Sequence, residues 1–247
     1  MRVFLDLWGV LLDSDTMQRE YGRKLAGYFH GRFGGDEGRW RDAHKASWTE
    51  YVVAIESPAW DRAHWAATMD RLDARFVVSI LERMDVPWRP DDPLAFSRDL
   101  DQRVMSTINA RFPDARAAVE RLRADGHAVY VATQATEANA RGSLTGAGLL
   151  DSLQGLFTGS SQDASKARRE YWDRVLRTLA VPPEGCVLVD DRADYLAAAH
   201  SAGFQALLLD REGVYEPETM PSFVRATLRN LAGLPQFVET LEEEGRR

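Results

Sequence analysis

The sequence predicts an α/β protein: a doubly wound parallel sheet with helices on both faces, and a helical insert after the first strand. Short, almost continuously apolar segments, each ending at a polar residue, are typical of strands buried on both faces of a parallel sheet. Segments with helical spacing separate these strands in the second half of the chain. Residues 14–110 carry helical patterns and few strand signals, so they interrupt the alternation.

Five segments are predicted to be strands because they are short, rich in β-formers and bounded by polar or turn residues. They are Val3 to Leu5, Ala128 to Ala132, Leu156 to Phe157, Cys186 to Val189, and Phe204 to Leu209.

Helices are predicted between the strands, over Pro113 to Asp125, Ser165 to Ala180 and Tyr195 to Ala202. Glycine or proline follows each of them, as is common at helix ends. Strands that alternate with helices form βαβ units and hence a Rossmann-like core. The segment 211–236 is expected to be a loop and a helix, and the charged end, Thr240 to Arg247, is expected to fray.

We therefore expect two domains: a core made of residues 1–13 and 111–247, and a helical cap made of residues 14–110. The cap holds five of the seven tryptophans, which predicts a small core of its own, with some rings available to line a pocket. These tryptophans are Trp40, Trp48, Trp60, Trp65 and Trp88.

Composition excludes several classes of protein. The 247 residues are 45% hydrophobic and 28% charged, which is an ordinary globular mixture. No segment approaches the roughly 20 apolar residues of a membrane span, and the first residues do not resemble a signal peptide. We therefore expect a cytoplasmic protein without a membrane partner. The net charge of −7 disfavours a nucleic-acid partner, and the single cysteine, Cys186, excludes an internal disulfide.

Polar residues follow the predicted strands at the positions where open parallel sheets bind ligands. Asp6, Thr133, Asp190 and Asp191 end three strands, and Lys166 stands near the start of a helix. Carboxylate oxygens suit Mg²⁺, and a carboxylate can also act as a nucleophile. Hydroxyl and ammonium groups can bind the oxygens of a transferred phosphoryl group. The set therefore indicates phosphoryl or acyl-like transfer through an aspartyl intermediate.

In order and spacing, these segments resemble the four motifs of the haloacid dehalogenase (HAD) superfamily. The first is the apolar strand that ends at Asp6 and continues as Leu7-Trp8-Gly9, and the second is the strand that ends at Thr133. Lys166 follows 33 positions after Thr133, and the acidic pair that ends at Asp191 follows 25 positions later. The helical insert directly after the first motif resembles the C1-type cap of this family.

The resemblance implies a role for each matching position. Asp6 corresponds to the nucleophile, Thr133 to the phosphate-binding hydroxyl, and Lys166 to the lysine that neutralises both nucleophile and phosphate. Asp191 corresponds to a direct Mg²⁺ ligand and Asp190 to a direct or water-mediated one. The backbone carbonyl of Trp8 would be a further ligand. The implied substrate is a small phosphorylated molecule.

The chain departs from the family phosphatases at Trp8, where they carry a second aspartate as general acid/base. Tryptophan cannot transfer that proton, and loss of a general acid/base typically costs ~10²–10⁴ in rate. The first interpretation is still a Mg²⁺-dependent phosphatase, in which His30, Asp13 or water supplies the proton, or the leaving group needs little help.

Two other interpretations remain open. The 2-haloacid dehalogenases carry an aromatic residue at the Trp8 position and use an arginine from the early cap, for which Arg19, Arg23 and Arg32 are candidates. They lack the acidic pair, however. Alternatively, the scaffold has lost catalysis and binds a ligand or partner.

The family residue that orients the lysine aligns with Tyr195, so Asp194 is a candidate substitute.

Overall fold

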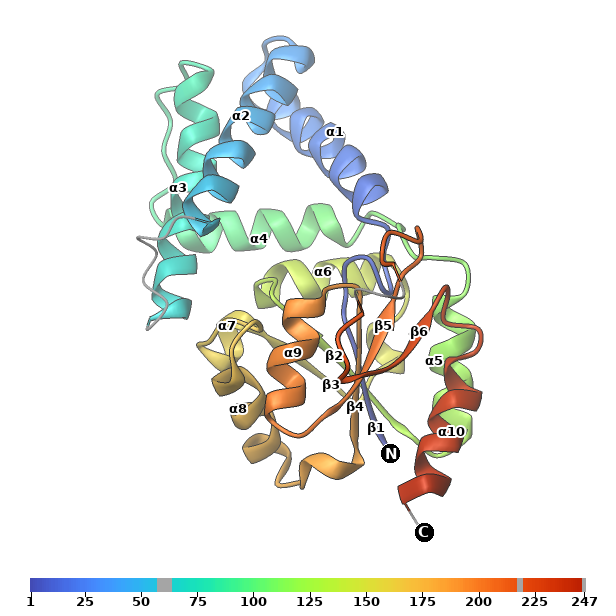
Figure 1. Cartoon of the computed structure of the whole chain (residues 1–247). Helices are drawn as coiled ribbons and strands as arrows, with labels where there is room; N and C mark the ends of the chain where they lie inside the picture. Colours follow the sequence, from blue (N-terminus) through green and yellow to red (C-terminus); the bar gives the residue numbers. More distant parts are fainter. Residues whose placement is uncertain (57–63, 217–219, 246–247) are drawn as a thin grey trace.

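The structure is a computed structural model that describes residues 1–56, 64–216 and 220–245. Six parallel strands form one sheet in the order β3-β2-β1-β4-β5-β6. The predicted fold class is confirmed, because helices cover both faces of this parallel sheet (Figure 1). The strands are β1 (Arg2–Leu5), β2 (Ala128–Thr133), β3 (Gly155–Thr158), β4 (Cys186–Asp190), β5 (Gln205–Leu209) and β6 (Val224–Leu228).

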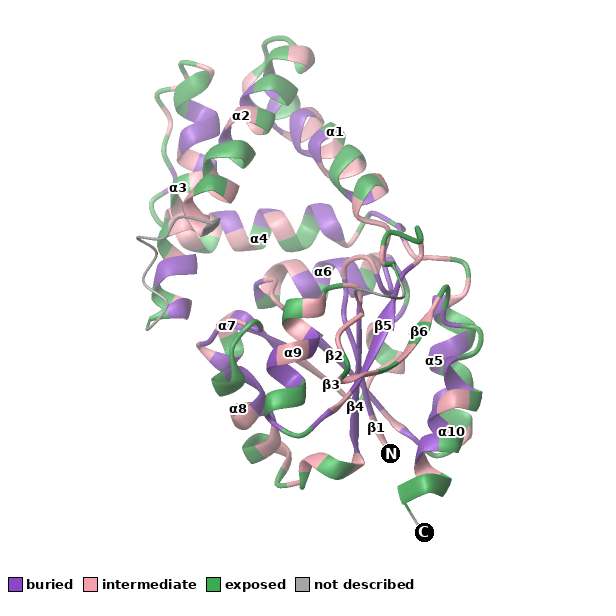
Figure 2. Cartoon of the chain, in the orientation of Figure 1, coloured by how far each residue is buried: buried purple, intermediate pink, exposed green. Residues whose placement is uncertain are grey.

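Both faces of the sheet are buried, because successive side chains of each strand point to opposite faces. In β1, Val3 and Leu5 belong to one hydrophobic cluster and Phe4 belongs to the other. The first cluster includes residues of α5 (Ala115–Ala124) and α10 (Leu234–Gly245). The second includes residues of α8 (Arg169–Leu179) and α9 (Ala193–Ser201). Figure 2 shows the central strands as buried along most of their length.

Two expectations for the C-terminal part are wrong. The segment 211–236 contains a strand, β6, which pairs in parallel with β5. Its signal is weak because β6 is an edge strand that alternates half-buried and exposed residues over Val224–Leu228. The charged end is helical as far as Gly245, because Leu234, Val238 and Leu241 anchor α10 on the sheet. The last two residues, 246–247, lie outside the described part.

Four helices stand between β1 and the core helix α5: α1 (Ser14–Phe33), α2 (Glu37–Glu56), α3 (Trp65–Arg83) and α4 (Pro93–Met105). We call them the inserted helices. They stack above the carboxyl ends of the strands (Figure 1). Helix α4 contacts α6 (Glu137–Gly146), and α3 contacts α7 (Gly159–Gln162). The division of the chain into a core and a cap at residues 13/14 and 110/111 remains a prediction.

The tryptophans of the inserted helices have different environments. Trp40 is buried and stacks on Phe29 with ring centroids 5.1 Å apart. Trp88 packs against Phe33. Trp48 and Trp65 line a cavity described below. Trp60 lies outside the described residues. In the part of the chain that the structure describes, no helix is long and apolar enough to cross a membrane.

Candidate active site

The sequence-predicted acids meet at the carboxyl end of the sheet because β1 and β4 are neighbours in register. Leu5 pairs with Val189, and the next residues of the two strands are Asp6 and Asp190. The backbone amide of Asp6 continues the ladder by donating to the carbonyl of Val189 at 3.0 Å. One carboxylate oxygen from each of Asp6, Asp190 and Asp191 lies within 4.8 Å of the others. Hard oxygen donors at this spacing fit a magnesium ion.

Lys166 is fully buried between two of these acids. Its Nζ donates to Oδ1 of Asp6 and lies 2.5 Å from Oδ2 of Asp190. Burial alone would lower the pKa of Lys166, but the carboxylates of Asp190 and Asp6 outweigh burial and raise that pKa. Lys166 is therefore a permanent cation that pairs with two of the three carboxylates and offsets one negative charge.

Burial raises the pKa values of both members of the acidic pair. Desolvation raises the pKa of Asp190 well above its usual range, and Asp6 adds repulsion that Lys166 partly offsets. Desolvation and the charge of Asp6 likewise raise the pKa of Asp191 to about 6. A cation bound here would stabilise the ionised form of both acids.

The neighbouring βα loop holds Lys166 in place. Thr133 ends β2, is 1% exposed, and accepts the amide of Ala135 at its Oγ1. The next residue, Gln134, accepts the backbone amide of Lys166 at 2.7 Å and the hydroxyl of Ser165 at 3.2 Å. Gln134 was missed in the sequence, although its position directly after a strand-ending hydroxyl residue was an available signal.

Asp194 does not take the proposed place beside the lysine. It is half-exposed and pairs with Arg192 at 2.8 Å. The ring of Tyr195 instead faces Lys166, with Nζ 4.9 Å from the ring centroid. The aromatic face therefore supplies the contact, as a ring quadrupole attracts a cation.

A cavity of about 630 Å³ lies between the inserted helices and the sheet. Its lining on the core side includes Trp8 and Gln134. Trp8 is close in sequence to Asp6, and Gln134 contacts the backbone of Lys166. Of the sequence-predicted site residues, Trp8 alone lines this cavity. Of the three candidate arginines, Arg19 lines it.

The other candidates from the first inserted helix have partners elsewhere. Arg23 pairs with Glu20 at 2.8 Å, and Arg32 stacks over the ring of Trp88 at 4.4 Å. Asp13 caps α1 by accepting the backbone amide of Asp15 at 3.2 Å, and it also accepts the hydroxyl of Thr16 at 2.6 Å. The ring of His30 is exposed and hydrogen-bonds to the carbonyl of Gly35 at 2.8 Å. These contacts disfavour Asp13 and His30 as proton donors.

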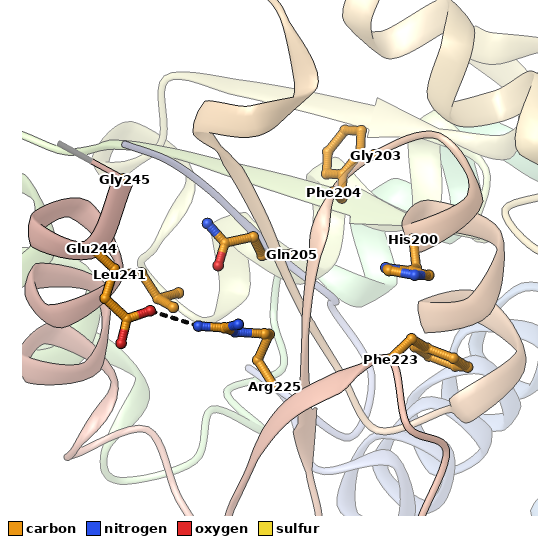
Figure 3. A pocket seen from close by; sticks show the side chains of 9 residues that line it. All are labelled: His200, Gly203, Phe204, Gln205, Phe223, Arg225, Leu241, Glu244 and Gly245. Atoms are coloured by element: carbon orange, nitrogen blue, oxygen red, sulfur yellow. Dashed lines mark hydrogen bonds and ion pairs between the residues drawn. The ribbon is translucent and has the colours of Figure 1, made fainter. Parts of the chain in front are cut away.

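A second cavity, of about 390 Å³, lies beside the first residue of β5, Gln205, at the opposite end of the sheet. Figure 3 shows the Arg225–Glu244 ion pair crossing it and His200 lying over Phe223. None of the sequence-predicted site residues lines this cavity. The acid end therefore remains the candidate reaction site.

Comparisons with known proteins agree with this geometry. The family model of haloacid dehalogenase-like hydrolases matches residues 1–203, so the chain belongs to that family of hydrolases. Over 103 residues it is 33% identical to the phosphatase MT3486 of Mycobacterium tuberculosis (strain CDC 1551 / Oshkosh), covering 41% of this chain and 48% of that protein. The chain thus spans about half the length of the curated relative it matches.

Solved structures share the fold at low sequence identity. The HAD phosphatase of Thermococcus onnurineus has a TM-score of 0.64 and 18% identity, covering 96% of this chain and 97% of the other. The L-2-haloacid dehalogenase of Xanthobacter autotrophicus, with chloropropionic acid covalently bound, has a TM-score of 0.56 and 16% identity, covering 96% and 98%. Both phosphatases and dehalogenases therefore share this architecture.

Proposed function

We propose that this hydrolase is a Mg²⁺-dependent phosphatase that cleaves a small phosphate ester through an aspartyl intermediate on Asp6. The observation that carries the proposal is the convergence of Asp6, Asp190 and Asp191 around the buried Lys166. An acidic pair beside the nucleophile serves a metal-dependent reaction, because repelling carboxylates need a cation to stay ionised.

The donor set fits magnesium, since it consists of carboxylate oxygens. Asp6 and Asp191 would hold the ion directly, with Asp190 direct or through water, and the Trp8 carbonyl as a further ligand. When bound, the ion neutralises charge on the phosphoryl group.

The chain's own residues then account for the transfer. A carboxylate oxygen of Asp6 forms a bond to phosphorus while the bond from phosphorus to the ester oxygen breaks. Thr133 and Lys166 hold the phosphoryl oxygens by charge-assisted hydrogen bonds. Water then attacks the aspartyl phosphate, which releases phosphate and restores the carboxylate of Asp6.

The proton for the leaving oxygen does not come from Trp8, whose indole is not a usable acid at neutral pH. We infer that it comes from water, or that the leaving oxygen departs as an anion. Esters of acidic alcohols should therefore react fastest.

The inserted helices would act as a cap. We propose that residues 14–110 form this unit and that residues 1–13 and 111–247 form the core, in the cytoplasm, with a small phosphorylated molecule as the substrate. Helices above a site can exclude water from it.

A second candidate is a 2-haloacid dehalogenase, because Arg19 lines the cavity and an aromatic residue stands at position 8. In that reaction Asp6 displaces halide from carbon, and the halide leaves without a proton. The acidic pair is the observation against it.

A turnover screen separates these candidates. Wild type, Asp6→Asn, Asp191→Asn and the control Asp194→Asn would each receive phosphate esters and 2-haloacids, with Mg²⁺ or with EDTA. The phosphatase predicts phosphate release that needs Mg²⁺, Asp6 and Asp191 but tolerates the control, which replaces a half-exposed acid in the first turn of α9. Halide release that survives EDTA would indicate the dehalogenase. No release of phosphate or halide from either substrate set would favour a binding scaffold.

A further inference from the structure

One side of the cavity is a continuous wall of rings, which we call the aromatic wall. It consists of Tyr21, His44, Phe76, Tyr51 and Trp48, all of which line the cavity. Neighbouring ring centroids along it are 5.5, 5.8, 5.8 and 5.4 Å apart. The rings come from α1, α2 and α3, so their meeting is a product of helix packing.

The aromatic wall carries no charge at neutral pH. Burial lowers the pKa of His44 to about 4, so its imidazole is neutral. Faces of aromatic rings have a negative potential that attracts cations.

Two carboxyl groups line the same cavity. Asp73 accepts the phenol of Tyr51 at 2.9 Å. Asp101 accepts the side-chain amide of Asn139 at 3.4 Å and the phenol of Tyr21. These contacts, from residues of three other helices, orient both carboxyl groups.

Among the contacts that the structure describes, Asp101 has no ion pair, and the ion pair of Asp73 with Arg98 is long. Desolvation raises the pKa of Asp73 to about 6 and that of Asp101 to about 7. Arg98 lies 3.8 Å from Asp73, but its closer partner is Asp70.

The cations of the cavity lie at its rim. Arg19, Lys45 and Arg98 line the cavity, yet the side chains of Arg19 and Arg98 are 65% and 36% exposed and Lys45 is also exposed. The acids are the more buried charges: the side chain of Asp73 is 13% exposed. The interior of the cavity therefore favours a positive group over a negative one.

Unpartnered polar groups of both kinds line the cavity. Among the described residues, the buried Oδ1 of Asn139 is an acceptor without a hydrogen-bond partner, and the buried Nε2 of Gln134 is a donor without one. Oδ1 of Asn139 and the oxygens of Asp73 and Asp101 offer acceptors to a ligand that brings donors.

We propose that this cavity selects phosphate esters whose alcohol carries an ammonium group. The cation would lie against the aromatic wall and be paired by Asp101 and Asp73, with the phosphate toward the acids beyond Trp8. The inference rests on the phosphatase proposed above and adds the class of its substrate. An ammonium ion here would gain cation–π contact and neutralise a desolvated carboxylate.

Matched substrates test the selection. A series of ω-aminoalkyl phosphates would be compared with ω-hydroxyalkyl phosphates of equal length, and kcat/KM measured for each. We expect the amine to be preferred at least tenfold at the best length, and this ratio to fall at least tenfold in Asp101→Asn and in Asp73→Asn. The control Asp99→Asn replaces an exposed acid of the same helix that pairs with Arg103, and should keep the ratio. A wild-type ratio near one, or a ratio that both cavity variants retain, would overturn the proposal.

Direct binding distinguishes failure of this inference from failure of the phosphatase. Butylammonium and butanol would each be titrated into wild type, with calorimetry and tryptophan fluorescence as readouts, since Trp48 belongs to the wall. Binding of the cation alone, without phosphate release from any ester, would support the cavity and reject the phosphatase. Phosphate release without preference for amines, and no butylammonium binding, would reject the cavity and keep the phosphatase. If a variant fails to fold, the wild-type comparison of cation and alcohol still decides.

Discussion

Gly9 lies so close to the side chain of Asp191 that a β-carbon at this position would displace the carboxylate. A β-carbon on Gly9 would overlap Oδ2 of Asp191 and lie 2.7 Å from its Cγ. The backbone of Gly9 also has φ +77°, which residues with a side chain rarely adopt. The loop after β1 and the acidic pair after β4 thus touch through a residue without a side chain.

Gly9→Ala is expected to displace Asp191, because the methyl group and the positive φ act at the same position. We expect a loss of about 1–3 kcal/mol of unfolding free energy and at least tenfold weaker Mg²⁺ activation, measured by thermal unfolding and metal titration. Gly27→Ala is the control, since nothing lies within 4 Å of the corresponding β-carbon in α1. Unchanged metal activation in Gly9→Ala would contradict the expectation.

Trp8→Asp should supply the proton donor that the wild type lacks. We expect kcat for alkyl phosphates to rise by about 10²-fold, and kcat for aryl phosphates to rise much less, because aryl leaving groups need no proton. In Trp8→Asp, a plot of log kcat against the pKa of the leaving group should have a shallower slope than in the wild type. Trp8→Asn creates similar space without an acid, so an equal gain in both variants would refute proton transfer as the cause.

Asp163 connects the core to the inserted helices and should stabilise the start of α3. Its Oδ1 accepts the amide of Ala66 in the first turn of α3 at 2.9 Å, and its own φ is +44°. Asp163→Ala should lose the hydrogen bond to the Ala66 amide and keep the strained φ, which should lower the unfolding free energy by about 1–2 kcal/mol. Asp163→Asn keeps an acceptor and tolerates positive φ, so it should lose less than half as much. Equal losses of unfolding free energy in the two variants, measured by denaturant unfolding, would contradict this role.

Asp101 should make the stability of the metal-free protein depend on pH. Its pKa is about 7 in the folded protein and about 3.9 in an unfolded chain. Between these values the folded state binds more protons, so the unfolding free energy falls as pH rises through 7. In EDTA, Asp101→Asn should be more stable than wild type at pH 8, and this advantage should shrink by about 1–3 kcal/mol at pH 5. A difference that is independent of pH would show that Asp101 titrates normally.

The core could be predicted from sequence because its strands are nearly continuous apolar segments that end at polar residues. The alternation from Val3 to Leu209 fixes five strands, and their carboxyl ends bring Asp6 and Asp190 to one edge whatever the details of packing. Strand β6 was missed because its exposed edge lacks the apolar signal on which the other strands were recognised.

The sequence by itself determined five of the strands of the sheet, the position of the acids at its edge, and the absence of a general acid at Trp8. Only the tertiary structure decided that Gln134 holds Lys166, that Arg19 rather than Arg23 or Arg32 lines the cavity, and that Asp73 and Asp101 join an aromatic wall. The physical reason is the distance along the chain between the residues that form each feature. Strand patterns and motifs are local in the chain, whereas the cavity is assembled by helices whose crossing angles depend on side-chain packing that no single segment encodes.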